Sequence, residues 1–108
     1  MEKEINNLTV GDILYCTWGC DRTYVEFYQI VKKTPKSFTV QEIKGKVVDG
    51  DPLRAFHMIA DESNEAIGEP QTARVLKGKY IGIKTYGGHK LLNHWDGKPI
   101  WGSTGYEG

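Results

Sequence analysis

The chain has 108 residues, of which 39% are hydrophobic and 26% charged, so it can build one hydrophobic core but has no room for a second domain. Its 14 basic residues balance 14 acidic ones. This excludes a long-range field that would attract the whole molecule to nucleic acid or to an anionic membrane, and any electrostatic contact must be local. We expect a single domain over residues 1–108.

The compartment is indicated by what the sequence lacks. The first residues are charged and do not form the apolar run of a signal peptide, and no stretch is apolar for the roughly eighteen residues of a membrane span. We therefore expect a cytoplasmic protein with no membrane partner. Two cysteines are too few for a disulfide framework, and in a reducing compartment they stay thiols unless they bind metal.

Strand-forming residues dominate the first part of the chain. A turn at Gly11-Asp12 lies in a first extended segment over 8–18, and a polar turn over 19–23 leads to a second strand over 24–33. Apolar or aromatic side chains fall on both faces of that second strand. We expect one face in the core and the other partly covered or used for contact. A turn over 34–37 then predicts a hairpin with a third strand over 38–43.

The second part of the chain begins with a weakly patterned acidic stretch over 45–69, which predicts a long loop. Within it, the apolar run over 53–60 fits a short helix or a strand, and we favour a strand. Segments 72–76 and 79–86 predict a hairpin. A turn over 96–99 precedes Ile100-Trp101, and the end from residue 102 reads as a loose tail. With 13 glycines at such breaks, we predict a mainly β fold: a small antiparallel sheet or a partly open SH3-like barrel with an acidic excursion.

Two segments carry a family resemblance. Residues 10–31 read VGDILYCTWGCDRTYVEFYQIV and residues 95–99 read WDGKP. Together they resemble a family of small phage and mobile-element proteins with the pattern GDIxYxSWGYDQTNxxFYQVV followed by WDGKP. The sequence departs from this pattern at Cys16, Cys20, Arg22 and Tyr24, where a polar residue, Tyr, Gln and Asn are usual.

The resemblance implies that the protein is encoded by a phage or mobile element, and the family has no assigned activity. It suggests a phage-type accessory protein in the host cytoplasm. By analogy with that setting, it suggests an inhibitor of a host defence system, such as an anti-CRISPR protein, which binds a host protein such as a defence nuclease.

Aromatic side chains near the first and last turns favour protein binding. Tyr and Trp anchor interfaces because they bury a large area and carry a polar group. Trp18 and Trp95 flank turns, so for either of them we favour a structural role in fixing a loop over a role in contact. The candidate contact residues are Tyr15, Trp18, Tyr24, Tyr28, Trp95 and Trp101.

A basic segment from residue 71 to 94 favours nucleic-acid binding instead. It contains no acidic residue, and two tyrosines are interleaved with its basic side chains. On a small barrel such a pattern can hold a phosphate backbone and stack bases. The other interpretation is a hairpin edge on which lysines prevent strand addition. The candidate residues are Arg74, Lys77, Lys79, Lys84 and Lys90.

Soft ligands leave a structural zinc site as a third hypothesis. The set is Cys16, Cys20, His57, His89 and His94, although three spacer residues between the cysteines are looser than a common zinc knuckle. A Cys–His–Asp triad using Asp96 rests on residue type alone, and no catalytic motif is present. We therefore expect no enzyme and no required cofactor. Protein binding ranks first, and monomer and homodimer both stay open.

Overall fold

The structure is a computed structural model that describes residues 7–19, 23–51, 53–76, 80–85 and 88–103. Within these ranges the fold is mainly β, as predicted. The strands, in chain order, are β1 (Ile13–Trp18), β2 (Tyr24–Lys33), β3 (Ser37–Ile43), β4 (Gly45–Gly50), β5 (Ala55–Ala60), β6 (Gln71–Leu76), β7 (Tyr80–Thr85), β8 (Gly88–His94) and β9 (Ile100–Ser103).

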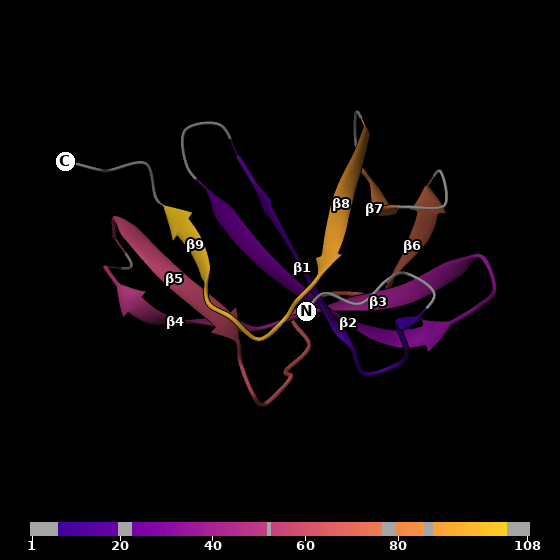
Figure 1. The fold of residues 1–108 in the computed structure, drawn as a ribbon, viewed down its shortest axis with the longest axis horizontal. Coiled ribbons are helices and arrows are strands. Elements are labelled where there is room, and N and C mark those ends of the chain that lie inside the picture. The colour runs from indigo at the N-terminus through magenta and orange to yellow at the C-terminus, as the bar shows by residue number, and fades with distance from the viewer. Residues whose placement is uncertain (1–6, 20–22, 52, 77–79, 86–87, 104–108) are drawn as a thin grey trace.

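Six strands form an antiparallel barrel in the order β1-β2-β3-β6-β7-β8. The barrel is closed rather than partly open, because β8 pairs with β1 through Leu14↔His94 and Tyr15↔Asn93. The predicted hairpins β2–β3 and β6–β7 are both present. In Figure 1 the strands of the barrel occupy the centre and right of the view.

The prediction of a long loop over the acidic stretch 45–69 is wrong for its first part. Residues 45–60 form the hairpin β4–β5, and β9 joins it to complete a second sheet in the order β4-β5-β9, at the left of Figure 1. The strand favoured over 53–60 is confirmed as β5. Gly102 and Ser103, expected in a loose tail, belong to β9, and Ser103 forms a bridge with Thr23.

Two hydrophobic cores explain the mixed pattern of β2. Tyr28 and Ile30 face the barrel interior with Leu14 and Val40, whereas Phe27 on the opposite face packs against the second sheet. The second core also contains Ile43 and Ala60, with Met58, Trp95 and Ile100 beside it. The apolar residues on both faces of this strand are therefore explained by burial on both faces. In the described part of the chain, no helix is long and apolar enough to cross a membrane.

Candidate functional site

The outer face of β6, β7 and β8 carries basic side chains. Alternation along β6 points Ala73 and Val75 into the barrel core, which leaves Thr72 and Arg74 on the outside. On β7, Ile81 and Ile83 face inward, so Gly82 and Lys84 face outward. The cross-strand pairs Arg74↔Gly82 and Lys84↔His89 bring side chains from all three strands together.

These residues surround a hollow of about 360 Å³, which we call the basic hollow; its lining is Thr72, Arg74, Gly82, Lys84 and His89. Gly82 keeps it open. A Cβ built on this glycine would lie 2.7 Å from Cδ1 of Leu76 and 3.4 Å from Cβ of His89. A glycine within a strand often marks a place where another group approaches the backbone closely.

The chemistry of the basic hollow suits an anion. The guanidinium of Arg74 can form two parallel hydrogen bonds to a phosphate, Lys84 adds a point charge, and the hydroxyl of Thr72 is a further donor. None of the lining residues is acidic. Tyr80 and Leu91 lie on the same outer face, about half exposed at 50% and 47%. The face therefore combines positive charge with an exposed aromatic ring, although the whole chain is neutral.

The basic residues predicted from the sequence divide into two groups. Arg74 and Lys84 meet at the basic hollow. Lys90 is paired with Ile83 across the sheet and faces the barrel interior instead, because the alternation of β8 sends His89 outward and Lys90 inward. Lys77 and Lys79 lie outside the described residues. His89, proposed above only as a metal ligand, is the group at the hollow that the sequence interpretation did not assign to it.

Lys90 belongs to a polar network at the barrel mouth, by which we mean the end where β1 finishes and β2 and β8 begin. Its Nζ donates a hydrogen bond of 2.6 Å to Oε1 of Glu26, and the side chains of the two are 24% and 18% exposed. Tyr28 donates its hydroxyl to the same oxygen at 2.8 Å. The thiol of Cys16 lies 3.6 Å from it. A single carboxylate thus contacts side chains from β1, β2 and β8, and Trp18 also hydrogen-bonds to it.

The pKa values in this network follow from burial and from charge. Burial alone raises the pKa of Glu26, but the hydrogen bonds from Lys90 and Tyr28 outweigh it, and the pKa falls below its ordinary value. Burial, together with the negative charge of Glu26, raises the pKa of Cys16 to about 12. The same two causes raise the pKa of Glu42, which lies opposite Tyr28 on β3. The Cys16 thiol is therefore protonated at neutral pH and is a poor nucleophile.

Trp18 and Tyr24 form a stacked pair at the mouth, with ring centroids 4.3 Å apart and an angle of 25° between the planes. Nζ of Lys90 lies 5.4 Å from the centroid of the Trp18 ring, within the range of a cation–π interaction. Because β1 lies between β8 and β2, the side chains of Lys90, Trp18 and Tyr24 follow one another across the sheet; we call them the aromatic row. Trp18 is 45% exposed and Tyr24 39%.

The other aromatic candidates have different positions. Tyr28 is 2% exposed inside the barrel and offers no contact surface, whereas Tyr15 and Trp95 are partly buried against the second core. Trp95 also locks its turn, because its Nε1 donates to the carbonyl of Lys98 at 2.8 Å. Trp101 is 46% exposed on β9.

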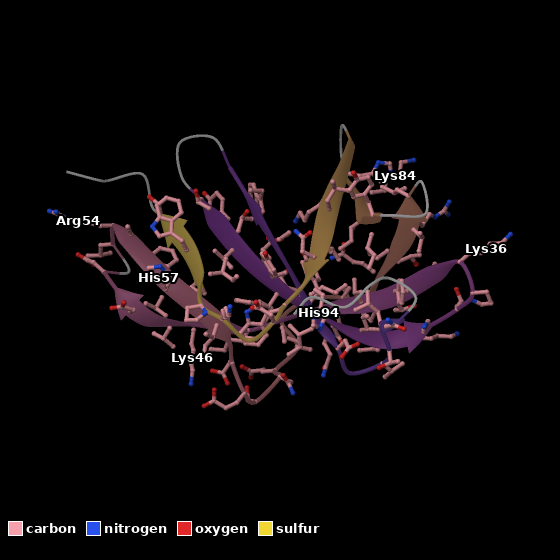
Figure 2. All side chains as sticks on the ribbon, in the orientation of Figure 1. Lys36, Lys46, Arg54, His57, Lys84 and His94 are labelled. Carbon is pink, nitrogen blue, oxygen red and sulfur yellow. The ribbon has the colours of Figure 1, made fainter. Side chains whose placement is uncertain are left out.

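The structure does not bring the candidate metal ligands together. Cys16 faces the barrel interior, His89 faces the basic hollow, and Figure 2 shows His57 on the second sheet, well away from His94. No group of three or more potential ligands occurs among the described residues. The described members of the Cys–His–Asp triad are not brought together either, because Cys16 is buried in the barrel core whereas Asp96 is exposed in its turn, where it accepts a hydrogen bond from the Lys98 amide. Cys20 lies outside the described residues.

Comparisons with known proteins add no further constraint: no family model, curated protein or solved structure matches this chain. The class that the fold defines is therefore a small closed β-barrel with an appended three-stranded sheet. Its candidate functional features are the basic hollow and the aromatic row.

Proposed function

We propose that this chain is a small non-enzymatic module that binds single-stranded nucleic acid on the outer face of β6, β7 and β8. The basic hollow carries this proposal. The hollow is lined by the side chains of Arg74, Lys84, His89 and Thr72 and by Gly82, and by no carboxylate. Arginine, lysine and hydroxyl side chains are among the groups that bind backbone phosphates in nucleic-acid complexes.

A single strand fits this face better than a duplex. Tyr80 is half exposed on the same face, and an exposed aromatic ring can stack only a base that is not already stacked within a duplex. The hollow also falls within the range of small-ligand sites, about 300–1,000 Å³, which suits one phosphate and its sugar better than a duplex groove. The zero net charge of the chain implies modest affinity, and its salt dependence should come from the few cations at the hollow.

The test is a titration of fluorescent oligothymidylate with purified protein, followed by anisotropy between about 50 and about 200 mM salt. In the double variant Arg74→Gln/Lys84→Gln, the slope of log affinity against log salt should fall by about 1.4, because each cation releases about 0.7 of a counterion from a single strand. We expect affinity about tenfold weaker at low salt.

Arg54→Gln provides the matched control. Arg54 is an exposed arginine just before β5, and Figure 2 shows it at the opposite end of the molecule from Lys84. Because it removes one charge outside the proposed face, affinity and salt slope should stay close to those of the parent protein. Equal effects of the control and the double variant would mean that binding is diffuse electrostatics, and no binding at all would refute the proposed function.

A second candidate is contact with a host protein, and Trp101 is the observation that favours it. Its neighbours on β9 both face the barrel side, since Ile100 packs in the second core and Gly102 abuts Phe56 and Val25. Trp101 therefore projects from the opposite face of the second sheet, next to His57 on β5. Large exposed aromatic side chains are typical interface anchors.

This candidate is the phage-type accessory protein that the family resemblance implies, with a host defence protein such as a nuclease as its partner. Binding of a purified defence nuclease, measured by calorimetry, should be lost in Trp101→Ala and kept in Arg74→Gln/Lys84→Gln. The reverse pattern would favour nucleic acid as the ligand.

A further inference from the structure

The aromatic row and the basic hollow lie at the same end of β8 but on opposite faces of the sheet, because the row is on the interior side of the barrel and the hollow is on the outside. His89 lines the hollow, and the next residue, Lys90, points to the other side of the strand and lies over the Trp18 ring. Successive residues of a strand are about 3.8 Å apart at Cα. A ligand that fills the hollow needs to pass over only the beginning of β8 to reach the rings at the barrel mouth.

The rings are held in place before any ligand arrives. Glu26 fixes Lys90 at 2.6 Å, and Lys90 in turn lies 5.4 Å from the Trp18 ring centroid. Tyr24 stacks on Trp18. Ordering these side chains costs a ligand little additional entropy, although 45% of Trp18 and 39% of Tyr24 is exposed to solvent.

We propose that the Trp18–Tyr24 pair stacks an unpaired base of the same nucleic-acid strand whose phosphate occupies the basic hollow, through the face of Tyr24 that Trp18 does not cover. This inference rests on the proposed function and adds a ligand class to it, because phosphate binding alone does not require bases. Aromatic rings stack all four bases, so the pair selects single strands over duplexes without selecting a sequence. The charge of Glu26 does not oppose the strand, since it is neutralised by Lys90 behind the rings.

The experiment compares two fluorescent strands of equal length, an oligothymidylate and an abasic deoxyribose-phosphate strand with the same number of phosphates. The basic hollow can hold the phosphates of both strands, whereas the rings can recognise only bases. The parent protein should bind the oligothymidylate about five- to a hundredfold more tightly than the abasic strand, which is the range measured for stacking of a base on an aromatic side chain.

Variants assign this preference to the rings. The double variant Trp18→Ala/Tyr24→Ala should lower the affinity for oligothymidylate towards that for the abasic strand, and an unchanged affinity for the abasic strand would show that the barrel is still folded. Trp101→Ala, a tryptophan of equal exposure on the second sheet, should keep the full preference.

The outcomes separate the two proposals. Equal binding of both strands by the parent protein, with the salt slope intact, would overturn base stacking and leave phosphate binding in the hollow standing. A preference that persists in Trp18→Ala/Tyr24→Ala would also overturn it. Failure to bind either strand would overturn the proposed function together with this inference.

Discussion

Lys90 on β8 reaches past β1 to place its Nζ 2.6 Å from the Glu26 carboxylate on β2. The two residues are 64 positions apart in sequence, and their contact joins the last strand of the barrel to the second. Lys90, which the sequence suggested as a surface cation, is therefore part of the barrel interior. The ion pair therefore links the stability of the barrel to the position of the aromatic row.

Removal of the Glu26 charge should destabilise the protein. In Glu26→Gln the ammonium of Lys90 remains mostly buried without its ionic partner, and Tyr28 and Cys16 lose their charged acceptor. Because both members are partly exposed, we expect a loss of about 1–3 kcal/mol in the free energy of unfolding, measured with urea. The exposed pair Lys46–Glu62 gives the control, and Glu62→Gln should produce no resolvable change. A Glu26→Gln protein as stable as its parent would contradict this role.

The stability of the protein should decrease in acid through Glu26. Its pKa is lowered in the folded state, so its stabilising contribution is complete above the ordinary value of 4.5 and is lost as the pH falls through the lower folded value. Urea midpoints between pH 7 and about pH 3 should show this loss in the parent protein. Glu26→Gln should give a flatter profile, and an identical acid dependence in the two proteins would be inconsistent with the assignment.

Glu42 should behave in the opposite way. Burial and the neighbouring Glu26 raise its pKa, so its ionised form costs stability at neutral pH, and this cost disappears as the pH falls through its folded pKa. We expect Glu42→Gln to be neutral or stabilising at pH 7, with the difference shrinking in acid. A clear destabilisation at pH 7 would show that the Glu42 carboxylate has a stabilising partner.

Cys16 should resist alkylation until the barrel unfolds. It is 2% exposed, and its raised pKa of about 12 keeps it protonated. A Cys20→Ser background leaves Cys16 as the single thiol. Iodoacetamide at pH 8 should label this variant slowly in buffer and completely in denaturant, as followed by mass. Rapid labelling of the folded protein would contradict the buried position and reopen a reactive-thiol interpretation.

Gly102 should be essential for packing of the two sheets against each other. A Cβ at this position would lie 2.6 Å from Cε2 of Phe56 and 3.0 Å from Cγ2 of Val25. Gly102→Ala should therefore lower the free energy of unfolding by about 1–3 kcal/mol. Gly88→Ala is the control, because a Cβ there meets nothing within 4 Å. Similar thermal midpoints for both variants would show that the structure accommodates a methyl group at position 102, which would contradict this prediction.

The sequence predicts the barrel well where local patterns suffice. The strand over 24–33 and the hairpins are encoded by alternation and turn residues. Apolar residues on both faces of β2 indicated a second face that is partly covered or used for contact, and the structure buries Phe27 of that face against the second sheet. The second sheet was missed because its core is completed by β9, about forty residues further along, and β4 offers little hydrophobic pattern of its own. Such long-range pairing leaves no local signal.

The candidate site was only half predictable for the same reason. Composition identified the basic segment. Whether a lysine in it faces outward depends on its place in the alternation of its strand, because successive side chains point to opposite faces. Lys90 faces inward because it pairs with the inward-facing Ile83, and that pairing cannot be read from composition. Glu26, between aromatic and apolar residues of β2, gave a signal that could have been used, because a carboxylate on a buried strand face requires a partner. Gly82 within an apolar strand was a similar signal for the hollow.

The most direct test of the account is a map of backbone amide shifts in ¹⁵N-labelled protein as unlabelled oligothymidylate is added. We predict saturable shifts that concentrate on Thr72, Arg74, Gly82, Lys84 and His89 and extend to Trp18 and Tyr24, with the second sheet around Trp101 unchanged. Shifts centred on β5 and β9, or a spectrum that does not change at saturating oligonucleotide, would contradict it.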